Sequence, residues 1–254
     1  MLKHMLISII TSTYNSAALI EDALDSFLIQ SYQEKELLVI DGASQDDTCV
    51  KVETRMKHQV FQMISEPDKG IYDALNKGIQ MAKGDVIGIL HSDDVFASPD
   101  VLSKVARIFE QEPEVMAVYG DLQYVKRGNK DEVMRNWVSG ASSSKKLNWG
   151  WMPPHPTLFI RKACFQKYGA YDLQYRSAAD YDLILRFLYR YQIKTAYIPE
   201  VLVKMRVGGV SNASWRNRWR ANQEDRQAMK VNGISYPLFA SLWKPLRKLK
   251  QFLK

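Results

Sequence analysis

Short apolar runs alternate with longer segments of helical periodicity along the first half of the chain. The apolar runs cover residues 6–10, 37–40, 61–64, 86–90 and 115–119. Runs of this length, apolar at nearly every position, are typical of buried strands in a parallel sheet. Segments with apolar residues at helical spacing cover residues 16–30, 47–56, 71–82 and 99–110. This alternation predicts an α/β fold with a mostly parallel central sheet flanked by helices.

The second half of the chain is less regular. Residues 121–144 are polar and contain two glycines and a Ser-Ser-Ser-Lys-Lys run, which predicts a loop or a pair of strands. A further strand is expected at 157–161. In the loop 149–156, the tryptophans and prolines fit either sugar binding or packing. The Val-Gly-Gly-Val-Ser-Asn segment 207–212 indicates either a hinge or a plain connector.

Polar loops follow three of the predicted strands at their carboxyl ends. They cover residues 12–15, 41–44 and 91–94. In open α/β sheets, ligands bind beyond the carboxyl ends of the strands, so these loops predict a ligand crevice. The charges of Asp93 and Asp94 repel, so both stay ionised at little cost only if a cation or hydrogen-bond donors share their site. Mg²⁺ or Mn²⁺ would suit such a pair of oxygen ligands. The alternative is that this pair only begins a turn or caps the next helix.

The composition limits the classes of protein that fit. At 254 residues and 46% hydrophobic residues, the chain can form one large domain or two closely packed halves. Two distant cysteines indicate a reducing compartment and no disulfide scaffold. The apolar run at the amino terminus is read as the first strand and not as a secretion signal, and no stretch approaches the length of a membrane span. The loops lack both Gly-rich phosphate motifs, which favours a nucleotide held through metal.

Positive charge is concentrated at the carboxyl-terminal end. Residues 1–205 hold 24 Lys and Arg against 26 Asp and Glu, whereas residues 206–254 hold 11 against 2. Leucines recur at helical spacing within 238–253 among lysines, a pattern that suits a helix lying in a membrane surface. The alternative is that these leucines pack on the rest of the protein. No nucleic-acid-binding motif accompanies the charge, so nucleic acid is not expected as a partner.

Four segments in this order and spacing closely resemble the family 2 glycosyltransferases. They read ISIITSTYN, LLVIDGASQDDT, EPDKGIYDALNKGI and AKGDVIGILHSDD, and the resemblance extends to about residue 210. It implies a GT-A fold with a Rossmann-like sheet and an inverting enzyme of the type that builds bacterial cell-surface polysaccharides. It also implies a nucleoside-diphosphate sugar as donor, with a UDP-sugar expected, and a divalent cofactor, Mn²⁺ or Mg²⁺.

The resemblance also assigns residues to roles. The residues matching the donor-binding positions are Ser12, Tyr14, Asp41, Asp68, Asp93 and His155. The matching metal ligands are Asp93 and Asp94. The chain departs from the family pattern at His91, which stands where the metal motif often begins with Asp. It also has Leu75 where many relatives have an Arg before the Asn, and Lys69 and Lys77 are the candidates for the missing charge.

Asp180 matches the acidic residue that, in the family, takes the proton from the acceptor hydroxyl. On a helix it shares a face with Leu183 and Ile184, so apolar surroundings are expected, which suit a general base. Capping of this helix is the alternative role for Asp180. Asp182 stands four residues before Arg186, a spacing that predicts a surface ion pair.

These expectations define three regions. Residues 1–100 form the nucleotide-sugar-binding half, 101–212 the acceptor-binding and catalytic-base half of the same domain, and 213–254 a basic helical tail. The acceptor is expected to be a glycan or a lipid-linked molecule, met at the inner face of the cytoplasmic membrane by a cytoplasmic, peripheral protein. The alternatives are a nucleotidyltransferase that activates sugars and a non-catalytic glycan- or membrane-binding module.

Overall fold

A computed structural model describes residues 5–208, 215–235 and 237 of the protein. Within these residues a single sheet runs through the molecule in the order β3-β2-β1-β4-β8-β6-β9-β5, with β7 paired to the outer part of β6. The strands are β1 Ile7–Thr13, β2 Lys35–Asp41, β3 Phe61–Ser65, β4 Val86–Ile89, β5 Val95–Phe96, β6 Ala117–Lys126, β7 Asn129–Trp137, β8 Phe159–Arg161 and β9 Thr195–Arg206.

The first four strands are parallel, as the alternation of apolar runs and helices predicts. β2 and β4 both pair with β1, and β3 pairs with β2. The short strand β8 joins this half to the second half by antiparallel pairing with β4 and β6, and β6 and β9 are again parallel. The polar segment after residue 121 forms the β6–β7 hairpin, which was the strand-pair alternative.

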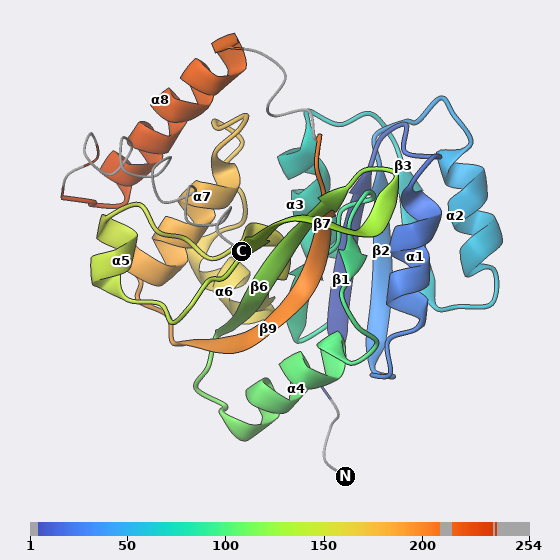
Figure 1. Cartoon of the computed structure of the whole chain (residues 1–254), viewed down its shortest axis with the longest axis horizontal. Coiled ribbons are helices and arrows are strands. Elements are labelled where there is room, and N and C mark those ends of the chain that lie inside the picture. The colour runs from blue at the N-terminus through green and yellow to red at the C-terminus, as the bar shows by residue number, and fades with distance from the viewer. Residues whose placement is uncertain (1–4, 209–214, 236, 238–254) are drawn as a thin grey trace.

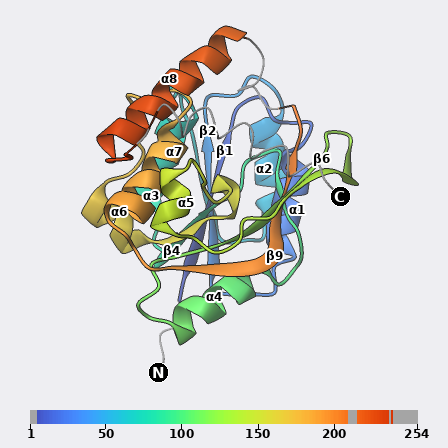
Figure 2. The ribbon, with the colours of Figure 1, turned by 60° about the vertical axis from the view of Figure 1, so that its left-hand side comes forward.

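Helices cover both faces of the sheet (Figures 1 and 2). They are α1 Ile20–Leu28, α2 Thr48–Met56, α3 Ile71–Met81, α4 Val101–Gln111, α5 Ser144–Asn148, α6 Lys162–Tyr168, α7 Ala179–Ile184, which continues as a π-helix over Leu185–Arg190, and α8 Trp215–Val231, with a 3₁₀ turn at His155–Thr157. One apolar core lies under α1, α2 and α4, and the other under α3, α6, α7 and α8. Gly78 lets α3 approach β1, since a Cβ there would lie 2.5 Å from Ile10.

The first helix begins four residues later than the sequence predicts. The backbone N–H of Ser16 donates to Thr48 Oγ1 at 2.8 Å, and that of Ala17 donates to Asp46 at 3.1 Å. Asp46 also accepts from the N–H of Thr48 at 3.0 Å, so this carboxylate serves the start of α2. Residues 16 and 17 are therefore tied to the neighbouring loop, and α1 begins at Ile20.

The basic segment at the carboxyl end includes α8, which packs against the rest of the domain. Ala228 and Met229 are fully buried in the core that contains α7. Asn232 donates to Asp182 at 2.8 Å, and Glu224 accepts from the backbone N–H of Ser177 at 2.7 Å. The leucines expected to face a membrane, within 238–253, and most of the expected hinge, 209–212, lie outside the described residues.

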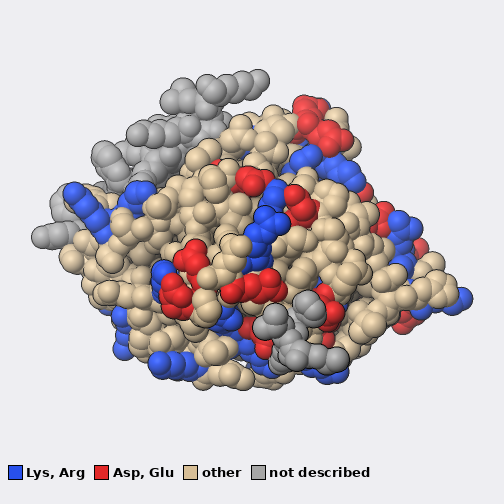
Figure 3. All heavy atoms as spheres, turned by 90° about the horizontal axis from the view of Figure 1, so that it is seen from below, with Lys and Arg blue, Asp and Glu red and all other residues tan. Residues whose placement is uncertain are grey.

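Charges are mixed on the face of the protein seen in Figure 3. Seen from below, acidic and basic side chains alternate, and neither gathers into a broad patch (Figure 3). Among the residues that the structure describes, no helix is both long enough and apolar enough to cross a membrane.

Candidate functional site

The three polar loops predicted to form a crevice lie side by side at one edge of the sheet. Their strands, β2, β1 and β4, are neighbours, so the carboxyl ends meet. The N–H of Asn15 donates to Ser44 Oγ at 2.8 Å, and the hydroxyls of Ser16 and Ser92 are 2.9 Å apart. The loop after β1 is thus hydrogen-bonded to the loops on both sides of it.

Asp41 is held as an anion at the end of β2. It is 1% exposed and accepts hydrogen bonds from the backbone and hydroxyl of Ser44, at 2.9 and 2.5 Å, and from the hydroxyl of Ser65, at 2.6 Å. Burial alone would raise the pKa of Asp41, but these donors outweigh it and lower the pKa. A fixed negative charge with defined acceptor directions suits a sugar hydroxyl or a base N–H.

Asp68 and Tyr14 meet beside Asp41, across Gly42. A Cβ added at Gly42 would stand 2.7 Å from Asp68 Oδ2 and 3.4 Å from the Tyr14 ring. Tyr14 is 61% exposed, so its ring is free to cover a ligand. Ser12 lies next to them within the sheet, buried, with no hydrogen-bond partner for its hydroxyl in the described part of the chain. Four of the predicted donor-binding residues are therefore brought together.

The two metal-ligand candidates differ in their surroundings. Asp93 is half-buried, whereas Asp94 is 1% exposed, and within the described residues neither oxygen of Asp94 has a hydrogen-bond partner. Burial, and then the charge of Asp93, raise the pKa of Asp94 well above its usual value. A buried, unpartnered carboxylate beside a second one fits a divalent cation, which supplies the missing partner. Among the described residues, no group of three or more His, Cys, Asp or Glu side chains could hold a metal ion.

Arg206 fixes the turn that carries these carboxylates. It is 4% exposed and lies at the end of β9, and its Nη1 donates to the backbone carbonyl of Asp93 at 2.7 Å. Its other nitrogens donate to the Asp22 carboxylate on α1 and, at 3.1 Å, to the carbonyl of Arg127 in the β6–β7 turn. Sequence reasoning missed this residue, and its only signal was a lone Arg before the Val-Gly-Gly segment.

Two neutral histidines form the next part of the site. The rings of His91 and His155 are 6.2 Å apart between centroids. Burial lowers the pKa of each from 6.5 to about 4, and the neighbouring His155 adds to the effect at His91. Both rings are therefore uncharged at pH 7. His155 Nε2 is 2.7 Å from the hydroxyl of Tyr171, a hydrogen bond that orients the ring.

Asp180 faces tyrosines and not the apolar core. The hydroxyl of Tyr72, on α3, donates to Asp180 Oδ1 at 3.0 Å, and the Tyr72 ring stacks on Tyr171 with 5.5 Å between centroids. Leu183 and Ile184, expected to share its apolar face, are fully buried while Asp180 is half-buried in the first turn of α7. Asp180 therefore lies at the edge of the apolar core and not inside it. Tyr72 and Tyr171, which sequence reasoning did not select, connect Asp180 to His155.

On α7, the buried carboxylate is Asp182 and not Asp180. It is 4% exposed, accepts from Asn232 of the segment after α8, and lies 3.4 Å from Arg186. The predicted ion pair with Arg186 is present, but it is buried and not at the surface, because α8 covers this side of α7. Burial raises the pKa of Asp182.

Two smaller expectations are also resolved. Trp151 is buried, and its indole N–H donates to the carbonyl of Ser139 at 3.0 Å, so it packs, whereas Trp149 is 44% exposed. Lys77 forms an ion pair with Glu66 at 2.7 Å, which leaves Lys69 as the freer candidate for the missing positive charge.

Sequence comparisons identify relatives of known class. The model of the family described as "Glycosyl transferase family 2" matches residues 8–169. The "PGL/p-HBAD biosynthesis glycosyltransferase" of Mycobacterium tuberculosis is 32% identical over 213 residues, covering 81% of this chain and 78% of the relative. An "Uncharacterized glycosyltransferase" of Haemophilus influenzae is 28% identical over 185 residues, covering 72% of this chain and 62% of that protein.

Solved structures with the same fold include two with bound ligands. TarS 1-349 of S. aureus, in complex with UDP-GlcNAc, has a TM-score of 0.71 at 18% identity, over 98% of this chain and 72% of that one. The mannosyltransferase PcManGT of Pyrobaculum calidifontis, in complex with GDP-Man and Mn²⁺, has a TM-score of 0.70 at 20% identity, over 99% of this chain and 73% of that one. At these identities the likeness establishes the fold.

Proposed function

The chain belongs to glycosyl transferase family 2, and from that premise we propose that it inverts the anomeric centre while moving a sugar from a nucleoside-diphosphate sugar to an acceptor hydroxyl. One observation carries the proposal. A fixed anion, a pair of carboxylates and a separate half-buried carboxylate, Asp180, all lie along the sheet edge formed by β2, β1 and β4 and by the helix starts beside it. Inverting transfer needs these groups together: a nucleotide site, a diphosphate site and a base.

The nucleoside is assigned to the loops after β1 and β2. Asp41 and Asp68 accept from base and ribose groups, Ser12 supplies a buried hydroxyl, and the exposed ring of Tyr14 stacks on the base. Because the structural neighbours were solved with UDP-GlcNAc and with GDP-Man, both uridine and guanosine donors deserve testing, and we expect a UDP-sugar.

The diphosphate is assigned to the turn at Asp93 and Asp94, which would hold Mn²⁺ or Mg²⁺. When bound, such a cation neutralises the charge that develops on the leaving diphosphate. Arg206 keeps this turn in place through the Asp93 carbonyl, and so links the position of the carboxylates to the end of β9. His155, neutral and oriented by Tyr171, offers one hydrogen bond to the diphosphate without adding charge.

Asp180 is assigned as the base. Its carboxylate accepts the proton of the acceptor hydroxyl while that oxygen forms a bond to the anomeric carbon of the donor. The bond from that carbon to the diphosphate oxygen breaks, and its electron pair leaves with the nucleoside diphosphate. Tyr72 donates to Asp180 Oδ1 and leaves Oδ2 available for the incoming proton.

Donor binding can be tested by thermal unfolding. UDP, GDP and their common sugar conjugates are added with Mn²⁺ or with EDTA. At a hundred times its dissociation constant, the correct donor stabilises the folded chain by about 2.7 kcal/mol, which corresponds to several degrees. We expect one nucleotide series to act and EDTA to weaken it. If no nucleotide shifts the transition under either condition, the proposal is wrong.

The acceptor and the location complete the proposal. We assign a glycan or lipid-linked acceptor of cell-surface polysaccharide or lipopolysaccharide synthesis, met at the inner face of the cytoplasmic membrane. α8 supports this assignment, since Trp219 is 68% exposed and the segment beyond residue 206 is strongly basic. Flotation with phosphatidylglycerol vesicles should recover the protein at low salt, and Trp219→Ser should reduce the recovered fraction. Equal recovery with neutral phosphatidylcholine vesicles would contradict an electrostatic membrane contact.

A further inference from the structure

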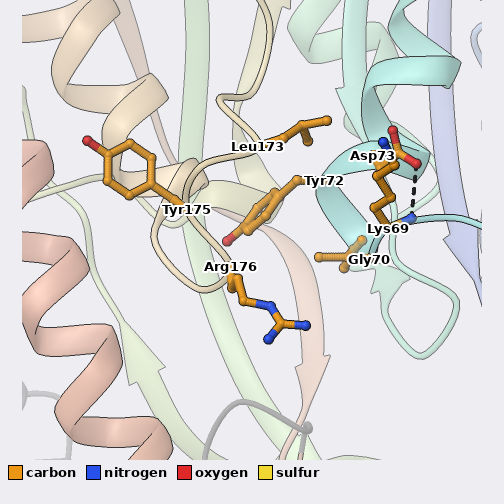
Figure 4. A pocket seen from close by; sticks show the side chains of 8 residues that line it. Lys69, Gly70, Tyr72, Asp73, Leu173, Tyr175 and Arg176 are labelled. Carbon is orange, nitrogen blue, oxygen red and sulfur yellow. Dashed lines mark hydrogen bonds between the residues drawn. The ribbon is translucent and has the colours of Figure 1, made fainter.

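A pocket of about 160 Å³ opens between the start of α3 and the loop that leads into α7, the helix that carries Asp180. Its α3 side is formed by residues 69–73, and its other side by Leu173, Tyr175 and Arg176 (Figure 4). Tyr72 stands in the middle of this group, with Leu173 on one side and Arg176 and Gly70 on the other, while the hydroxyl of Tyr175 points away from them.

The pocket is next to the proposed base because the two share Tyr72. The Tyr72 hydroxyl that donates to Asp180 Oδ1 at 3.0 Å belongs to the same side chain that lines the pocket. A molecule seated in the pocket therefore lies within one side chain of the carboxylate.

The pocket is separated from the nucleotide loops by the turn at residues 68–70. Asp68 Oδ1 accepts from the N–H of Gly70 at 2.8 Å, on the pocket side of the turn. Its other oxygen, Oδ2, is directed at Gly42 on the nucleotide side. The Asp68 carboxylate thus lies between the pocket and the nucleotide loops, and an occupant of the pocket is not the nucleoside.

The lining suits a sugar ring. Ile71 and Leu173 are each 45% exposed and, with the ring of Tyr72, offer apolar surface to C–H groups. Lys69, Asp73 and Arg176 offer hydrogen-bonding groups for hydroxyls, and in the part of the chain that the structure describes the Arg176 guanidinium has no ion-pair partner. The volume of about 160 Å³ holds several water molecules, so the pocket has room for a small ligand such as one sugar ring.

We propose that this pocket is the subsite for the sugar residue of the acceptor that carries the reacting hydroxyl, with Tyr72 positioning both that sugar and Asp180. The inference rests on the proposed glycosyl transfer and adds the substrate class: the acceptor presents a saccharide at its reacting end, not an amino acid side chain or a lipid alcohol.

Two variants test the subsite. Leu173→Trp fills the pocket, and Arg176→Ala removes the guanidinium that lines it. The matched controls are Val60→Trp and Arg107→Ala, both at exposed positions away from the sheet edge that carries the site. Binding of a panel of p-nitrophenyl hexosides is measured by saturation-transfer NMR in the presence of UDP and Mn²⁺, and affinity for UDP with Mn²⁺ is measured by calorimetry.

At least one hexoside should bind the native protein. Both pocket variants should lower the affinity for that hexoside about tenfold or more, while their affinity for UDP stays within twofold of the native value. The controls should match the native protein in both measurements. Hexosides that bind the variants as well as they bind the native chain, or a panel in which none binds, would overturn the subsite. Failure of UDP and GDP to bind the native chain would count against the proposed function, which is a separate result.

Discussion

Replacing Asp180 by Asn should reduce sugar transfer by about 10²–10⁴-fold while leaving nucleotide affinity unchanged. The amide has nearly the same shape as the carboxylate, and its oxygen can still accept from the Tyr72 hydroxyl, which donates at 3.0 Å in the native protein. It cannot accept the proton of the acceptor hydroxyl. The loss should therefore appear in kcat, with the KM of the donor little changed.

The measurement is release of nucleoside diphosphate during transfer, alongside calorimetric binding of UDP or GDP with Mn²⁺. Asp131→Asn is the matched control, because Asp131 is exposed on β7 and only pairs with Lys204 at 3.2 Å. The control should keep full activity. An Asp180→Asn variant that keeps more than about a tenth of native turnover would remove Asp180 from its assigned role.

Replacing Asp94 by Asn should stabilise the metal-free protein and at the same time abolish its response to Mn²⁺. In the metal-free chain, Asp94 is a buried carboxyl whose oxygens have no hydrogen-bond partner among the described residues, and burial and the charge of Asp93 raise its pKa well above 3.8. For a group whose folded pKa is raised, the stabilising contribution is complete below the unfolded pKa and is lost as pH rises towards the folded one. At neutral pH the native residue therefore destabilises the apo fold.

A neutral amide removes that penalty, which we expect to be about 1–2 kcal/mol, or about 2–8 °C in Tm for a chain of this size. The gain should shrink as pH is lowered towards 4. Thermal unfolding between pH 4 and pH 8, with and without Mn²⁺ and UDP, measures both effects, with Asp131→Asn again as control. An Asp94→Asn variant that is less stable at pH 7 in EDTA, or that still responds to Mn²⁺, would contradict the assigned role.

Much of the fold could be predicted from the sequence because its first half is locally consistent. The runs that become β1 to β4 are apolar at nearly every position, and the helices between them carry a clear 3.6-residue period, so the parallel half of the sheet follows from the pattern and is confirmed. The GT-A class came from the family resemblance and is confirmed as well. The start of α1 was misjudged because the deciding hydrogen bonds join Ser16 and Ala17 to residues about thirty positions away.

The site residues that could not be selected from the sequence were missed for one physical reason. Tyr72 and Arg206 act through hydrogen-bond partners 79 to 184 positions away, Tyr171 stacks on Tyr72, and no local pattern marks them. The same limit explains Asp182: an i, i+4 spacing to Arg186 says nothing about α8, which buries the pair. Residues at strand ends, such as Asp41, could be selected because topology alone brings those ends together.

Anomeric configuration gives the most direct test of the central claim, that one sheet edge combines a nucleotide-sugar site with a separate base for single displacement. The native protein is incubated with α-linked UDP- and GDP-sugars and Mn²⁺, and the sugar transferred to a hexoside or to water is followed by proton NMR before mutarotation. We predict that one donor is consumed and that its sugar first appears as the β anomer. An initial product with the α configuration, or no consumption of any donor, would contradict the account.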